Sequence, residues 1–138
     1  MATIRAYTTI EQSKKLAEIL PIESADMFWY LATKGNPVAG FNEGYNKYGD
    51  FELPCWSLTA LLSVLPNEII TGNRFECYYQ IHIRKYDGGD NTTLYQIAYG
   101  NNRGSSGSWH DMINTGEKDN LVDACYDMIL KLHELKML

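Results

Sequence analysis

The sequence has no apolar run that approaches the roughly 20 residues of a membrane-spanning helix, and its first fifteen residues, MATIRAYTTIEQSKK, contain no apolar signal core. It also lacks a long block of either charge, although 17 acidic against 12 basic residues leave a net charge of −5. This balance disfavours a broad nucleic-acid or anionic-membrane footprint. The composition, with 45% hydrophobic and 21% charged residues, is typical of a globular protein, and without a signal core or a membrane span we expect it to be cytoplasmic.

Cysteine and histidine are both scarce, and neither recurs at a spacing typical of a metal site. Cys55, Cys77 and Cys125 are widely separated and form no CxxC pair, which argues against a disulfide framework or a zinc knuckle. No HxH, HExxH, calcium-loop or phosphate-loop motif is present. The sequence therefore predicts no catalytic residues, no metal site and no cofactor.

The clearest pattern that is present covers residues 120–138, NLVDACYDMILKLHELKML. Its apolar residues recur at helical spacing, and Asn120 is a good N-cap for the first turn. These features predict an amphipathic helix that packs on the core. The predicted inner face consists of Leu121, Val122, Ala124, Cys125, Met128, Ile129, Leu132 and Leu135.

The same segment carries a second apolar stripe, formed by Tyr126, Leu130, His133 and Met137 at spacings of four, three and four. One interpretation is that a neighbouring loop covers these residues or that they lie exposed singly. The other is that they form a subunit interface, since a helix that is apolar on two sides usually has two partners. The second interpretation predicts a homodimer.

Other elements follow from capping and periodicity. The capping-box spacing places a first helix after Thr8 or Thr9, and Pro21 ends it. Residues 25–32 read as a buried strand, and the uncharged stretch 53–67 as an enclosed helix that Pro66 ends. Residues 75–86 alternate as a half-buried strand, and turn residues 87–91 lead into a second strand at 92–100, which predicts a hairpin.

Two stretches rich in glycine and asparagine, 34–51 and 100–118, show no periodicity. The first is predicted to be a long loop or a ragged hairpin, and the second a loop with a brief return to the sheet edge at residues 109–111. Long loops in compact domains often carry function. We therefore select Tyr45, Tyr48, Trp109 and His110 as candidate binding residues. The alternative is that the aromatic side chains only attach the loops to the body.

Together these elements predict a single α+β domain over residues 1–138. It would have three or four mainly antiparallel strands with three helices packed on one side.

Two chemical alternatives remain open beside a binding role. Cys55 lies near the start of the second predicted helix, where a thiolate is favoured, and with His82 or His110 it could form a small hydrolase or transferase site. The outer face of the predicted hairpin could instead bind single-stranded nucleic acid. That face would present Tyr78, His82, Arg84, Lys85 and Arg103.

The strings PCWSLTALLSVLP at 54–66, EQSKKLAEILPIESADM at 11–27 and LVDACYDMILKLHELK at 121–136 resemble those of small uncharacterised proteins from Bacteroides-type gut bacteria and their phages or mobile elements. The resemblance implies an intracellular protein of bacterial or phage origin, and it implies no activity or cofactor. The leading hypothesis is a non-enzymatic protein-interaction module that binds a protein partner or itself, with no membrane association.

Overall fold

The computed structural model describes residues 5–30, 35–41, 52–72, 77–103 and 107–138. The fold class is α+β, as the sequence predicts, with antiparallel strands in two sheets and three α-helices in the described residues. The chain divides into two compact units, Arg5–Val64 and a second unit made mainly of Leu65–Leu138. We call them the N-terminal and C-terminal units and describe each by itself.

The N-terminal unit contains a three-stranded antiparallel sheet in the order β2-β1-β3. Its elements are α1 (Ile10–Ile19), the short 3-10 helix η1 (Ile22–Ser24), β1 (Met27–Tyr30), β2 (Val38–Phe41), β3 (Glu52–Cys55) and α2 (Leu58–Val64). The predicted capping box is confirmed at Thr9, whose side chain accepts from the backbone N–H of Gln12 while the Gln12 side chain accepts from the N–H of Thr9.

Helix α2 begins later than the sequence pattern predicts, because residues 52–55 pair with β1 as strand β3. Ser57 marks the actual start: its Oγ accepts from the N–H of Ala60. The carboxylate of Asp26 in turn accepts from the N–H and the hydroxyl of Ser57. Strand β2 lies in the stretch predicted as a long loop or a ragged hairpin, and it pairs with β1 rather than within that stretch.

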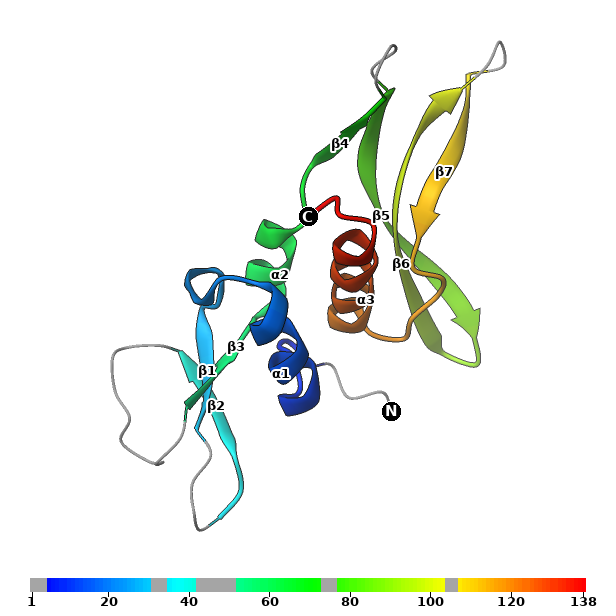
Figure 1. The fold of residues 1–138 in the computed structure, drawn as a ribbon. Coiled ribbons are helices and arrows are strands. Elements are labelled where there is room, and N and C mark those ends of the chain that lie inside the picture. The colour runs from blue at the N-terminus through cyan, green and yellow to red at the C-terminus, as the bar shows by residue number, and fades with distance from the viewer. Residues whose placement is uncertain (1–4, 31–34, 42–51, 73–76, 104–106) are drawn as a thin grey trace. The chain divides into compact units, whose positions relative to one another are not determined.

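The C-terminal unit contains a four-stranded antiparallel sheet in the order β4-β5-β6-β7 (Figure 1). The predicted hairpin is confirmed, with β5 at Cys77–Gly89 and β6 at Thr92–Arg103. The turn between them uses positive φ angles at Asp90 and Asn91. Strand β4 (Glu68–Thr71) flanks β5, and strand β7 (Ser108–Asn114) flanks β6.

The prediction of a loop over residues 100–118 is therefore wrong for most of its length. The return to the sheet edge, predicted at residues 109–111, is the seven-residue strand β7. The sequence of β7, SWHDMIN, does not alternate between apolar and polar residues, and its backbone hydrogen bonds to β6 stabilise it regardless of that pattern.

Helix α3 (Leu121–Glu134) contacts β6, as Figure 1 shows, and its predicted N-cap is confirmed, since the Asn120 side chain accepts from the N–H of Val122 at 2.8 Å. The buried core of this unit joins the inner face of α3 to the strands. It includes Leu65, Ile69, Tyr79, Ile97, Tyr99, Val122, Ala124, Cys125, Met128, Ile129 and Leu132. No helix in the described part of the chain is both long and apolar enough to cross a membrane.

Candidate binding face of the four-stranded sheet

The alternation of β5 divides the four-stranded sheet into two faces. Tyr79 of β5 belongs to the face with the buried Ile97 and Tyr99, which we call the inner face. The opposite side is the outer face. Strand pairing assigns to it Glu68, Ile70, Tyr78, Gln80, His82, Arg84, Tyr86, Leu94, Gln96, Ala98, Gly100, Asn102, Trp109, Asp111 and Asn114.

Two small residues of β6, Ala98 and Gly100, lie in the middle of the outer face. Because they offer almost no side chain, groups on β5 and β7 meet across β6. The imidazole of His82 stacks on the indole of Trp109, with ring centroids 3.5 Å apart and planes 11° from parallel. A Cβ at Gly100 would lie 2.9 Å from two atoms of the Trp109 ring, so glycine is required beneath the indole.

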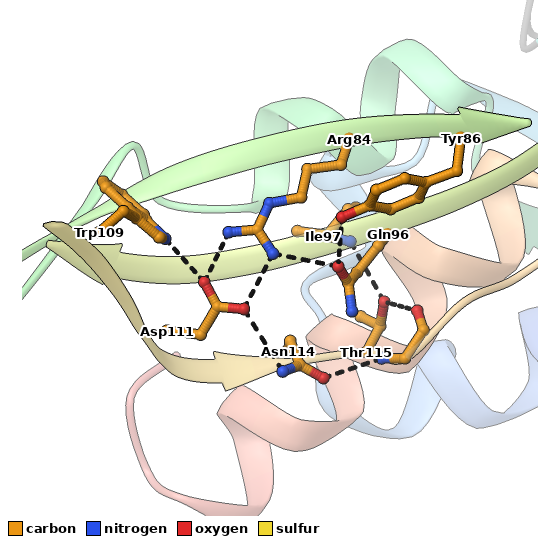
Figure 2. A network of polar contacts seen from close by, with 9 residues as sticks. Arg84, Tyr86, Gln96, Ile97, Trp109, Asp111, Asn114 and Thr115 are labelled. Atoms are coloured by element: carbon orange, nitrogen blue, oxygen red, sulfur yellow. Dashed lines mark hydrogen bonds and ion pairs between the residues drawn. The ribbon is translucent and has the colours of Figure 1, made fainter.

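A second contact across β6 lies beside this stack and joins Arg84 of β5 to Asp111 of β7 (Figure 2). The guanidinium donates to both carboxylate oxygens, from Nη2 to Oδ1 at 2.6 Å and from Nη1 to Oδ2 at 2.9 Å. The indole Nε1 of Trp109 also donates to Asp111 Oδ1, at 2.7 Å. Asp111 therefore links the stacked rings to the ion pair.

The network continues along β6, where Gln96 Oε1 accepts from Arg84 Nη1 at 3.0 Å and from the Tyr86 hydroxyl at 3.1 Å (Figure 2). A rotatable phenol and a flexible guanidinium are thus both held by one amide. These side chains are ordered before any partner arrives, which lowers the entropy cost of binding through them.

The Arg84 guanidinium, which donates hydrogen bonds to Asp111, lowers the pKa of that carboxyl to about 2, and the Trp109 indole acts in the same direction. The pKa of Arg84 is raised in return, mainly by the hydrogen bond to Asp111. Asp111 is a weak proton acceptor at neutral pH, so the cluster suits binding better than acid–base catalysis.

Comparison with protein-family models, curated proteins and solved structures finds no match to this chain. The resemblance to small proteins of Bacteroides-type bacteria and their phages stays a prediction. The chemistry of the face has to be read from its own residues.

Among the described residues, the outer face offers little free positive charge for a nucleic acid. Asp111 neutralises Arg84, and Lys85 lies on the opposite side of β5, paired with Tyr95 rather than with an outer-face residue. Phosphate contacts supply most of the affinity of nucleic-acid binders. The geometry thus supports the single-strand hypothesis less than the protein-binding hypothesis.

Of the four predicted binding residues, Trp109 lies on the outer face, and His110 is exposed on β7 but alternates to the other side. Tyr45 and Tyr48 lie outside the described residues. Sequence reasoning missed Gln96 and Asp111 as partners of Arg84, which lie 12 and 27 residues further along the chain. Gln96 faces Arg84 across the β5–β6 hairpin, whereas only the placement of β7 as a full strand brings Asp111 to Arg84.

The predicted interface stripe on α3 is only partly accessible. Tyr126, Leu130 and Met137 are half-buried, and His133 is exposed. The homodimer through this stripe stays a prediction.

Cys55, the centre of the alternative enzyme hypothesis, is fully buried in the N-terminal unit. Its Sγ lies 3.6 Å from Thr8 Oγ1 and 3.7 Å from the Thr8 carbonyl oxygen, and burial raises the pKa of the thiol. A buried thiol with a raised pKa is poorly reactive. Within the described ranges, no cluster of three or more His, Cys, Asp or Glu residues is arranged to hold a metal ion.

The ion pair between Arg84 and Asp111 makes the free energy of unfolding depend on pH. A carboxyl with a depressed pKa contributes stability above its unfolded pKa, near 3.8, and loses that contribution as the pH falls towards about 2. Since the pair is partly exposed, we expect a loss of about 1 kcal/mol over this range. Urea unfolding at pH 6 and pH 2 would measure it in the wild type and in Asp111→Asn. The variant should be less stable at pH 6 only, and equal differences at both pH values would contradict the assignment.

Proposed function

We propose that the protein is a non-catalytic protein-interaction module that binds its partner through the outer face of the four-stranded sheet. The observation that carries the proposal is the ordered cluster of Trp109, His82, Arg84, Asp111 and Tyr86, held by the contacts given above. Tryptophan, tyrosine and arginine dominate the binding energy of protein interfaces, above all where they are held in place.

Exposed apolar surface adjoins this cluster at the β4 side. Ile70 of β4 and Tyr78 of β5 are direct cross-strand partners, and they are 59% and 47% exposed. An apolar pair beside ordered aromatic and hydrogen-bonding groups matches the composition of an interface, with an apolar centre and a polar surround.

The charge balance of the face indicates the chemistry of the partner. Among the described residues, the positive charge of Arg84 is compensated by Asp111 within the face itself, which leaves the exposed carboxylate of Glu68 on β4. A strongly charged partner would gain little there, whereas an uncharged surface with apolar side chains and hydrogen-bonding groups would lose little on desolvation. The proposed partner is therefore a protein with an uncharged, partly apolar contact patch.

A matched pair of variants tests the proposal. Ile70→Ser with Tyr78→Ser removes exposed apolar surface from the outer face, and Ile83→Ser removes an equally exposed side chain (48%) from the inner side of β5. A protein captured by the wild type from a lysate of the source cells would be purified and titrated with all three proteins. We expect binding roughly 30-fold weaker for the outer-face variant and within about twofold for the control.

Salt dependence separates the protein partner from a nucleic acid. Binding through an uncharged patch should change little between low and high salt. Equal binding by both variants would overturn the proposal. So would salt-sensitive binding of a single-stranded oligonucleotide that the outer-face variant loses, because it would assign the face to nucleic acid.

A further inference from the structure

Strand β5 is longer than β4, the strand on one side of it. Among the described residues, β4 pairs with Cys77–Gln80 of β5, and one more backbone bond joins the Ile81 N–H to the Asn67 carbonyl at 3.2 Å. Beyond Ile81, β5 continues to Gly89, and the described part of the chain pairs it there with β6 on one side only. Residues 82–89 therefore form an open sheet edge, defined here as the β5 edge.

The backbone groups on this edge can be assigned. The Tyr95 N–H and the Ile97 carbonyl bond to Lys118 and Thr115 on the far side of β6. In an antiparallel ladder, the β5 residues opposite Tyr95 and Ile97 must then point their own backbone groups the other way. Those residues are Lys85 and Ile83, and Asp87 follows by alternation. The β5 edge thus presents the N–H and C=O groups of Ile83, Lys85 and Asp87.

We propose that the β5 edge pairs antiparallel with the β5 edge of a second copy of this chain, about a two-fold axis at Tyr86. The proposal is independent of the proposed function of the outer face. An open edge is a template for strand addition, and a two-fold axis lets the same strand serve as both partners. The dimer would join two four-stranded sheets into one continuous sheet.

The charges on the edge select this register. With the axis at Tyr86, Lys85 of each copy lies directly opposite Asp87 of the other, and the two tyrosines face each other. With the axis at Lys85 or Asp87, like charges would lie opposite each other. With the axis at Arg84, Asp87 would face Ile81, whose backbone already bonds to Asn67. A lysine on an exposed edge normally discourages strand pairing. Of these registers, only the one with the axis at Tyr86 places a carboxylate opposite Lys85.

The free length of the strand agrees with the same register. A two-fold axis at Tyr86 pairs residues 83–89 of one copy with 89–83 of the other. These residues lie between the part of β5 that pairs with β4 and the turn between β5 and β6, and they overlap neither. The side chains at the centre are accessible, since Lys85 and Asp87 are exposed and Tyr86 is 37% exposed.

Charge reversal tests the inference in the intact chain. Sedimentation velocity over a range of concentrations should show a monomer–dimer equilibrium for the wild type. Lys85→Glu should raise the dimer dissociation constant roughly tenfold, because two attractive pairs become repulsive. Combining Lys85→Glu with Asp87→Lys restores both pairs and should return the constant towards the wild-type value. A wild type that stays monomeric, or a double variant no better than Lys85→Glu, would overturn the inference.

Cysteine cross-linking tests the register independently of affinity. Residues directly opposite in a non-hydrogen-bonded antiparallel pair have Cα atoms about 4.5 Å apart, within disulfide range. In a Cys77→Ser background, Tyr86→Cys should form a disulfide-linked dimer on mild oxidation, whereas Lys85→Cys should not. Preferential cross-linking of Lys85→Cys would place the axis elsewhere and overturn the register.

Discussion

Replacing Gly100 with alanine is expected to lower the free energy of unfolding of the C-terminal unit by about 3 kcal/mol. A Cβ at this position would lie 2.2 Å from the backbone carbonyl oxygen of His110, besides the two Trp109 ring atoms at 2.9 Å. A backbone atom cannot rotate away as a flexible side chain can. The new methyl group therefore has to push β7 away from β6.

The displacement should reach the cluster as well as the backbone. Trp109 and Asp111 both belong to β7, so the stack on His82 and the ion pair with Arg84 would loosen together. Urea unfolding followed by circular dichroism measures the stability loss, and the indole N–H resonance of Trp109 reports on its bond to Asp111.

Gly40→Ala is the matched control. A Cβ at Gly40 would meet only one ring carbon of Tyr30, at 3.4 Å, which is ordinary van der Waals contact. We expect its stability to stay within about 0.5 kcal/mol of the wild type. If Gly100→Ala were equally neutral, the close packing of Trp109 over β6 would not exist in solution.

Local signals in the sequence predicted the first and last helices and the hairpin well. Thr9 with Gln12, Asn120, and the apolar spacing of 121–135 act within one or two turns of chain, so the residues that decide the structure lie beside each other in sequence. Alternation over residues 77–83 likewise reports directly on which side of β5 is buried.

The strands that were missed have no such local signal. Val38–Phe41 and Glu52–Cys55 each form four residues of strand only because β1 lies between them. Ser108–Asn114 depends on β6 in the same way. Short edge strands gain their stability from pairing with distant residues, and the local sequence pattern does not indicate that pairing.

The candidate site was predictable only in part, for the same reason. Tyr78, His82 and Arg84 were assigned to one face from the alternation of β5 alone. The partner that decides the role of Arg84 lies on β7, 27 residues further along the chain. An arginine that reads as a phosphate ligand in the sequence is a neutralised member of an ion pair in the structure.

The largest effect is expected for Met128→Lys, which should abolish cooperative folding of the C-terminal unit. Met128 is fully buried on α3, as are Cys125 and Leu132, which lie one turn before it and one turn after it. A buried ammonium without a partner costs several kcal/mol, comparable to the whole stability of a small domain. His133→Lys, at an exposed position of the same helix, is the control and should fold normally.

The same variant tests the prediction that residues 1–138 form a single domain. Two-dimensional NMR distinguishes signals of Arg5–Val64 from those of Leu65–Leu138, the two units into which the chain divides. If folding is cooperative across the chain, Met128→Lys should lose the dispersed signals of both units, including the indole of Trp56 in the buried N-terminal core. Survival of the N-terminal signals alone would show two independent domains, and a native spectrum throughout would contradict the burial of Met128.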